Sequence, residues 1–212
     1  MNLSPLNSFK ASMREHWNER YSAKEYIYGK SPNERFSRLI SNRSPGRLLL
    51  PGEGEGRNAV FAAQQGWEVV ALDQSEEGRC KALALAEESG VVIRYELGDL
   101  ATMPLPSGSF DLISLIFVHF PGSIRTEVHH RLLEVLAPGG TFHLVAFRPE
   151  QLKFGTGGPR DVDLLYTEDL LRQDFHGLSG LSIQILDDAF SEGSYHQGRY
   201  AGIELSGVKA PH

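Results

Sequence analysis

The stretch LLLPGEGEGRNAVFAAQQGWEVVALD, residues 48–73, decides the fold of this chain. Three glycines, at positions 52, 54 and 56, separate a short apolar run from a segment whose apolar residues have helical spacing. A second apolar run follows and ends at Asp73. A glycine-rich turn between a strand and a helix is typical of the ligand-binding turn in a doubly wound α/β sheet. Glu53 and Glu55 stand between the glycines, where such turns usually approach phosphate.

The alternation of strand-length and helix-length patterns continues along most of the chain. Apolar runs predict strands at 47–50, 68–72, 91–97, 110–116 and 141–146, and amphipathic spacing predicts helices at 58–65, 76–88 and 124–136. Residues 181–190 and 199–209 predict a closing antiparallel hairpin whose turn is 191–198. We therefore predict one Rossmann-like α/β domain over 1–212, with a mostly parallel sheet. Its expected parts are an N-terminal helix and lid (1–45), a cofactor-binding core (46–150), and an acceptor-side loop with the hairpin (151–212).

Composition narrows the classes of function. A net charge of −6 over 212 residues gives no basic surface for nucleic acid. Cys80 is the only cysteine, so no internal disulfide and no cysteine metal cluster can form. No apolar run approaches the ~20 residues of a membrane span, and the first residues lack a signal-peptide core. We expect a cytoplasmic protein that acts on a small molecule, and the sequence does not indicate its oligomeric state.

The charge of the glycine-rich turn separates two candidate cofactors. GEGRNA, residues 54–59, fits the dinucleotide pattern G-x-G-x-x-G/A, and Asp73 follows Gly54 by 19 residues, so NAD is one reading. However, Glu53 and Glu55 would each repel a nearby pyrophosphate by about 1 kcal/mol per close pair in water. S-adenosylmethionine has a sulfonium, an ammonium and a ribose diol but no phosphate, so this turn favours it. An NAD-dependent oxidoreductase and a non-catalytic S-adenosylmethionine-binding protein remain alternatives.

Polar residues at the expected strand ends suit the parts of that cofactor. Asp73 can accept hydrogen bonds from both ribose hydroxyls, or it can merely cap the following helix. Asp99 can accept from the adenine amine, or it can form a turn. We expect the free backbone N–H groups at the helix start, Arg57 and Asn58, to bind the cofactor carboxylate. The predicted cofactor-binding residues are Trp17, Gly52, Glu53, Gly54, Gly56, Arg57, Asn58, Asp73, Gln74, Ser75, Asp99, and Leu100 with Ile116 around the adenine.

Four motifs resemble a known enzyme family. They are HWNERYS (16–22), EYIYGKSPNERF (25–36), PGEGEGRNAVF (51–61) and SFDLISLIFVHFP (109–121). Over nearly the whole chain, the sequence resembles the class I S-adenosylmethionine-dependent methyltransferases, and within them the subgroup with tellurite-resistance and thiopurine methyltransferases. That resemblance implies methyl transfer to a small acceptor, such as a thiol or a selenium or tellurium oxyanion. The chain departs from the family at Leu50, because members of the family commonly have an acidic residue at this position. Glu53 is the candidate to replace that acid in binding the cofactor's ammonium.

Residues on the acceptor side are predicted less directly. His119 follows the fourth strand and is either a general base or a packed histidine, and Tyr28 is a second catalytic candidate in the lid. The predicted acceptor contacts are Tyr21, Arg148, Lys153 and Tyr166, and we expect no metal ligands. Helical periodicity places His129 and His130 on a solvated face and Cys80 among buried small residues.

Overall fold

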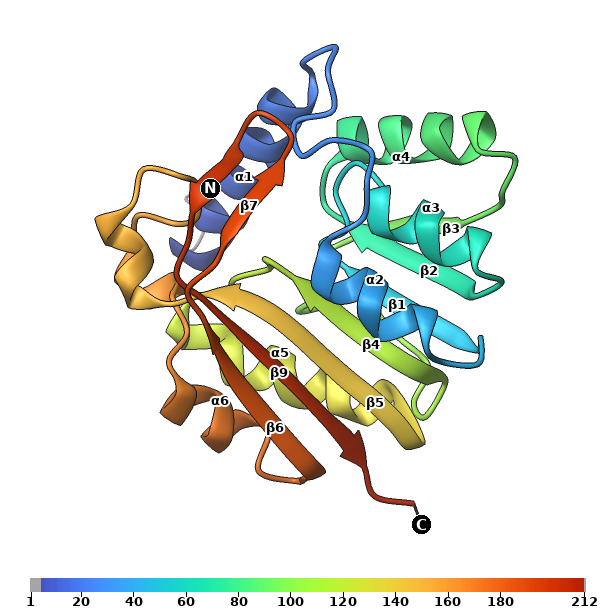
Figure 1. The fold of residues 1–212 in the computed structure, drawn as a ribbon, viewed down its shortest axis with the longest axis vertical. Helices are drawn as coiled ribbons and strands as arrows, with labels where there is room; N and C mark the ends of the chain where they lie inside the picture. The colour runs from blue at the N-terminus through green and yellow to red at the C-terminus, as the bar shows by residue number, and fades with distance from the viewer. Residues whose placement is uncertain (1–4, 212) are drawn as a thin grey trace.

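The structure, a computed structural model, describes residues 5–211, with side chains from residue 12 onward (Figure 1). Its elements, in chain order, are α1 (Pro5–Tyr21), α2 (Glu34–Ser41), β1 (Arg47–Pro51), α3 (Arg57–Gln64), β2 (Glu68–Asp73), α4 (Glu76–Glu88), β3 (Arg94–Leu97), β4 (Phe110–Ile116), α5 (Gly122–Val135), β5 (Leu136–Phe147), two 3₁₀ turns (Pro149–Lys153 and Val162–Leu164), α6 (Glu168–Asp174), β6 (Leu178–Leu186), β7 (Ala189–Glu192), β8 (His196–Arg199) and β9 (Gly202–Lys209).

Seven strands form one sheet in the order β3-β2-β1-β4-β5-β9-β6. The first five strands are parallel to one another, whereas β9 pairs antiparallel with β5 and with β6. This confirms the predicted α/β class with a mostly parallel sheet. The chain reverses its direction of winding between β3 and β4, so β1 and β4 are neighbours whose connections lie on opposite sides. Ligands bind at the carboxyl ends of strands beside such a switch point.

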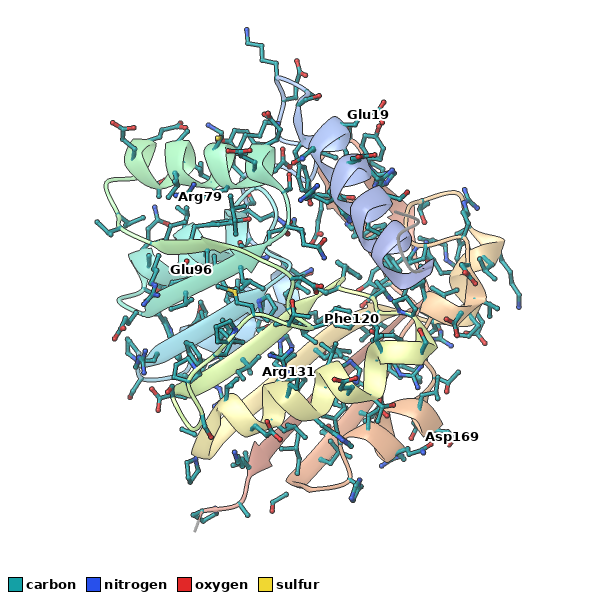
Figure 2. The ribbon with its side chains drawn as sticks, turned by 180° about the vertical axis from the view of Figure 1, so that it is seen from behind. Glu19, Arg79, Glu96, Phe120, Arg131 and Asp169 are labelled. Atoms are coloured by element: carbon teal, nitrogen blue, oxygen red, sulfur yellow. The ribbon has the colours of Figure 1, made fainter. Side chains whose placement is uncertain are left out.

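Alternation of side chains along the strands builds a core on each face of the sheet. On one face, Leu48 and Leu50 of β1 pack in a cluster with residues of α2, α3 and α4. On the other face, Leu49 packs with residues of α5 and α6. The strands are therefore apolar almost throughout, as expected for a parallel sheet covered on both sides. This double cover holds the strand ends, and the turns that leave them, in fixed positions (Figures 1 and 2).

The C-terminal region corrects one prediction. β6 and β9 do pair antiparallel, but residues 191–198 are more than their turn. β7 and β8 form a separate two-stranded sheet in which Glu192 pairs with His196 across a tight turn at Gly193 (φ 61°). The sequence pattern missed this hairpin because both strands are only four residues long and β8, with the sequence HQGR, has no apolar run. The hairpin rises from the sheet toward the N-terminal segment (Figure 1).

Two predictions of exposure are wrong. His129 is fully buried, because α6 covers the side of α5 that the local pattern indicated as polar, whereas His130 is exposed as expected. Cys80 is exposed, because α4 turns Ala82, Leu85 and Ala86 toward the sheet instead. Across residues 5–211, none of the helices has the length and apolar character needed to cross a bilayer.

Candidate functional site

A pocket of about 480 Å³ lies at the carboxyl ends of the central strands. Residues that follow β1, β2 and β4 line it, as do α1 and the loop before α6. In Figure 2, α1 with Glu19 near its end lies across this edge of the sheet, opposite Phe120 in the loop just before α5. The predicted residues that line the pocket are Trp17, Tyr21, Tyr28, Gly52, Glu53, Arg57, Asn58, Asp73, Gln74, Asp99, Leu100, Ile116 and His119.

The glycines of the turn serve the chain's own packing more than expected. All three have positive φ, which non-glycine residues rarely adopt. A Cβ at Gly54 would lie 2.5 Å from the Tyr21 hydroxyl, and one at Gly56 would lie 2.5 Å from the Ala82 Cβ. Neither glycine lines the pocket. At these two positions the missing side chain therefore makes room for the protein itself rather than for a ligand.

Glu53 occupies the N-terminus of α3. Its Oε1 accepts hydrogen bonds from the backbone N–H groups of Asn58 and Ala59, at 2.8 and 2.7 Å. Burial raises the pKa of Glu53 to about 7, although these hydrogen bonds and the Arg57 charge oppose that shift. The expectation that this helix start offers a free N–H at Asn58 is therefore wrong. A carboxylate of the chain fills the place that a phosphate takes in dinucleotide-binding turns.

Glu55 also lines the pocket, but its carboxylate anchors the N-terminal segment, residues 22–33. Its Oε2 accepts from the backbone N–H groups of Ile27 and Tyr28, at 2.8 and 3.4 Å. Its Oε1 pairs with the Lys81 ammonium at 2.8 Å, and its side chain is 3% exposed. The second glutamate of the turn therefore fixes the position of the predicted lid.

Removal of that anchor should loosen the segment. Glu55→Ala leaves the Ile27 N–H and the Lys81 ammonium without their partner, which should lower the free energy of unfolding by about 1–3 kcal/mol. Amide hydrogen exchange should accelerate selectively in residues 22–33. Glu34→Ala, at an exposed position of α2, is the matched control and should leave that exchange unchanged. Unaltered exchange in the Glu55 variant would show that other contacts hold the segment.

Asp73 lies at the end of β2, on the pocket wall. Its Oδ2 accepts from the Gly54 N–H at 3.0 Å and its Oδ1 from the Ser75 N–H at 2.9 Å, while burial raises its pKa. The cap of α4 is Ser75, whose hydroxyl accepts from the Gly78 N–H, so the alternative that Asp73 caps this helix is wrong. Ser75 itself is fully buried and does not line the pocket. Asp99 lines the pocket as well, with Oδ1 accepting from the Ala101 N–H.

Aromatic residues of α1 and the N-terminal segment form one side of the pocket. Trp17 and Tyr21 stack with ring centroids 5.4 Å apart. The Arg20 guanidinium lies 5.1 Å from the Trp17 ring and donates to the Tyr28 hydroxyl at 3.1 Å. Tyr28 is thus tied to α1, and burial raises its pKa.

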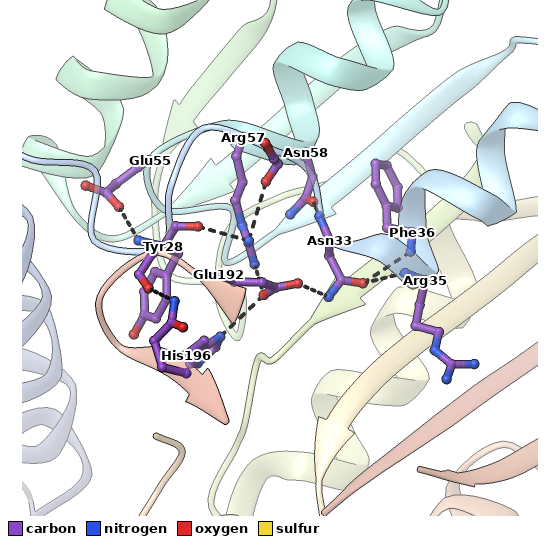
Figure 3. A network of polar contacts seen from close by, with 12 residues as sticks. Tyr28, Asn33, Arg35, Phe36, Glu55, Arg57, Asn58, Glu192 and His196 are labelled. Carbon is purple, nitrogen blue, oxygen red and sulfur yellow. Dashed lines mark hydrogen bonds and ion pairs between the residues drawn. The ribbon is translucent and has the colours of Figure 1, made fainter. Parts of the chain in front are cut away.

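Polar contacts join the N-terminal segment, α3 and the β7–β8 hairpin (Figure 3). The Arg57 guanidinium donates to the Tyr28 carbonyl at 3.1 Å and pairs with Glu192 at 2.7 Å. Asn33 donates through Nδ2 to the other Glu192 oxygen at 2.9 Å, and the Asn58 side chain accepts from the Asn33 N–H at 2.9 Å. The side chains of Arg57 and Asn58 therefore hold two distant segments against the pocket.

His119 is engaged by backbone groups on both ring nitrogens. Its Nδ1 donates to the Leu164 carbonyl at 2.6 Å, and its Nε2 accepts from the Phe147 N–H at 3.4 Å. Burial lowers its pKa to about 4, against the effect of the Leu164 hydrogen bond. This geometry favours the packed-histidine alternative over the general base.

Three predicted acceptor residues do not line the pocket: Arg148, Lys153 and Tyr166. Tyr166 is fully buried, and its hydroxyl accepts from the Phe120 N–H at 2.9 Å. Arg148 pairs with Glu150 and Asp187 at 2.9 and 2.6 Å, at the surface beyond the sheet. Both side chains are used to join segments of the fold, which leaves them unavailable to an acceptor in this pocket.

Several lining residues were not predicted: Phe117, Phe147, Gly158, Pro159, Arg160 and His196. Phe117 has φ 56°, the one non-glycine residue with positive φ between residues 5 and 211, and such an outlier at a strand end points to a site. His196 comes from the β7–β8 hairpin. In the sequence, the one feature that could have indicated His196 as a site residue is its position next to Tyr195 in an otherwise polar stretch.

The central region is similar to known methyltransferases. Residues 49–140 match a family described as "Methyltransferase domain". Over 113 residues, or 52% of this chain, the sequence is 29% identical to a demethylmenaquinone methyltransferase from Thermus thermophilus. The chain spans about half the length of that relative (51%).

Solved structures share the fold at low sequence identity. A magnesium protoporphyrin IX methyltransferase from Synechocystis, solved with S-adenosylhomocysteine bound, has a TM-score of 0.71 at 19% identity, covering 95% of this chain and 99% of that one. TehB from Haemophilus influenzae has a TM-score of 0.66 at 15% identity, covering 92% and 66%.

Proposed function

From a fold and a central domain that are those of the class I S-adenosylmethionine-dependent methyltransferases, we propose that this chain transfers the methyl group of S-adenosylmethionine to a small-molecule acceptor. The observation that carries the proposal is the position of Glu53. Its carboxylate occupies the α3 N–H groups that would otherwise bind a pyrophosphate, in the pocket that the ribose-binding candidate Asp73 also lines. A cofactor without phosphate fits this wall, and NAD does not.

The residues around the pocket match the parts of that cofactor. Asp73 would accept from the ribose hydroxyls, and Asp99 with Leu100 and Ile116 would hold the adenine. Glu53 and Glu55 both line the pocket, but the Glu55 carboxylate is already paired with the Lys81 ammonium, so Glu53 would face the ammonium of the amino-acid end. When bound, S-adenosylmethionine supplies a methyl group that its sulfonium has already activated. The chain's task is therefore alignment and exclusion of water.

The N-terminal segment and the hairpin supply the cover in this proposal. Residues 22–33 are held at one side by Glu55 and at the other by Glu192 through Arg57 and Asn33. Together with Trp17 and Tyr21 of α1, this lid would close the pocket within one methyltransferase unit over 1–212.

The proposed acceptor is a soft nucleophile, with a thiol as the first choice. Three observations support it, of which the first two are the motif resemblance to the tellurite-resistance and thiopurine subgroup and the shared fold with TehB. A third is that His119, neutral and bonded to backbone on both sides, leaves no strong base at the end of β4. An easily ionised acceptor loses its proton without a general base at that position.

Cofactor binding tests the proposal directly. Isothermal titration should show micromolar binding of S-adenosylmethionine and S-adenosylhomocysteine and no binding of NAD, because Glu53 would repel and displace the pyrophosphate. NAD binding of equal strength would overturn the assignment and favour the oxidoreductase alternative. Tight S-adenosylmethionine binding without turnover on thiol, selenite or tellurite acceptors would instead favour the non-catalytic alternative.

A further inference from the structure

The half of the pocket away from Asp73 is lined by aromatic side chains around one histidine. The His196 ring centroid lies 4.5 Å from that of Tyr28, 5.0 Å from that of Phe117 and 5.6 Å from that of Phe147. Phe117 and Phe147 stack on each other at 4.5 Å. The strained backbone at Phe117 places its ring in this wall directly after β4. Apolar faces of this kind suit a planar organic molecule.

His196 is oriented by a chain of charged contacts. Its Nδ1 faces the Glu192 carboxylate at 3.4 Å, and Glu192 is held by Arg57 at 2.7 Å and by Asn33 at 2.9 Å (Figure 3). Within the described part of the chain, the His196 ring forms a hydrogen bond through Nδ1 alone, and His196 lines the pocket. With the Nδ1 proton directed at Glu192, the lone pair of Nε2 is left for a ligand.

The groups around His196 keep it neutral near neutral pH. Burial lowers its pKa, and the hydrogen bond and charge of Glu192 oppose this shift while Arg57 and Arg20 add to it. Two further titratable groups lie near it: Tyr28, in ring contact with His196, and His119, whose ring contacts Phe147 as the His196 ring does. A neutral imidazole with a fixed tautomer can accept a proton, whereas His119 has both nitrogens engaged.

We infer that the acceptor is an aromatic compound bearing an ionisable thiol or hydroxyl group, and that His196 Nε2 accepts its proton. This inference rests on the proposed methyltransferase function. It limits the acceptor to an aromatic compound, and because His196 supplies a base, it adds a hydroxyl group to the thiol as the group that is methylated. The S–H or O–H bond of the acceptor breaks, and the proton moves to Nε2. The electron pair left on the acceptor forms the bond to the methyl carbon, while the pair of the former carbon–sulfur bond returns to sulfur. The imidazolium then releases its proton to solvent, with Glu192 stabilising its charge until release.

The same wall disfavours an inorganic oxyanion as the acceptor. Selenite or tellurite would have to give up its hydration against the rings of Phe117 and Phe147, which donate no hydrogen bonds in return. Arg160 is exposed at the pocket and has no ion pair among the described residues. An anionic substituent on an aromatic acceptor would find its partner there.

The ionisation state of a bound probe tests His196 without requiring turnover. 4-Nitrophenol absorbs at longer wavelength when it is ionised, so its spectrum reports whether it has lost its proton. With S-adenosylhomocysteine bound, we expect the wild-type protein to bind 4-nitrophenol in its ionised form at pH values below the pKa of the free phenol. His196→Gln should lower the ratio of ionised to protonated bound probe by about tenfold, equivalent to one pKa unit.

Matched variants separate proton acceptance from packing. His196→Phe keeps an aromatic ring to stack on Phe190, at 4.6 Å in the native protein, and should show the same loss of ionisation as the Gln variant. His130→Gln, at an exposed position of α5, should behave like the wild type. With 4-nitrothiophenol, which is already ionised at neutral pH, turnover should fall less in both His196 variants than turnover with 4-nitrophenol.

The outcomes are distinct. Equal ionisation in the wild type and both His196 variants would overturn the role of His196. Failure of 4-nitrophenol to bind the protein loaded with S-adenosylhomocysteine would overturn the aromatic acceptor. Failure of S-adenosylhomocysteine to bind the wild type, measured by titration calorimetry, would overturn the proposed function itself.

Discussion

Asp174→Ala is expected to lower the free energy of unfolding by about 3–5 kcal/mol, the cost of leaving buried charge unpaired. The Asp174 side chain is 1% exposed and accepts from Arg125 Nε at 3.0 Å, from the Thr126 hydroxyl at 2.9 Å and from His129 Nδ1 at 2.8 Å. All three donors lie on α5, so this residue at the end of α6 fastens the two helices together. Glu127→Ala, at an exposed position of α5, is the control, and urea denaturation at pH 7 is the measurement.

The same carboxylate predicts a pH dependence. Although burial alone would raise its pKa, the hydrogen bonds from His129, Arg125 and Thr126 lower the pKa of Asp174 to about 2. The unfolded chain therefore binds this proton at higher pH than the folded chain does. The contribution is complete above the ordinary value of 3.8 and is lost as the pH falls toward about 2. Wild-type and Asp174→Ala stabilities should converge in that interval, and a constant difference would show that packing, not charge, accounts for the effect.

Asp73→Ala should weaken the binding of S-adenosylhomocysteine by roughly 1.5–3 kcal/mol, or about 10- to 150-fold, the loss expected when hydrogen bonds to a charged acceptor disappear. Asp73 is half-buried at the end of β2, and its carboxylate retains lone pairs beyond those used by the Gly54 and Ser75 N–H groups. Asp99→Ala should have a smaller effect. The measurement is isothermal titration calorimetry on the wild type and each variant.

Thermal unfolding of the same variants separates binding from folding. Asp73→Asn keeps one oxygen for the backbone N–H groups but lacks the charge, so it should retain the melting temperature better than alanine while still binding the ligand weakly. Native affinity in Asp73→Ala would show that this carboxylate serves only the glycine-rich turn.

The amino-acid sequence by itself determined the architecture of the sheet. Apolar runs of strand length alternate with amphipathic segments, and this order leaves few arrangements other than a parallel sheet covered on both faces. The glycine-rich turn and Asp73 could be placed at the carboxyl edge of that sheet for the same reason, since parallel strands end on one side. The exact ends of the elements could not be predicted in this way. β3 begins at Arg94 rather than at residue 91, because the Val91 N–H still donates a hydrogen bond to the Ala86 carbonyl near the end of α4.

Only the tertiary structure decided what the charged side chains contact. Glu53 and Glu55 are two residues apart, yet one binds the start of α3 and the other holds a segment 28 positions earlier in the chain. His129 is buried because a later helix covers it, and His196 reaches the pocket on a hairpin too short and polar to show a periodic pattern. Periodicity reports on neighbours along one element, whereas these contacts join elements far apart in sequence. The fold could therefore be predicted from local patterns, and the partners of its buried charges could not.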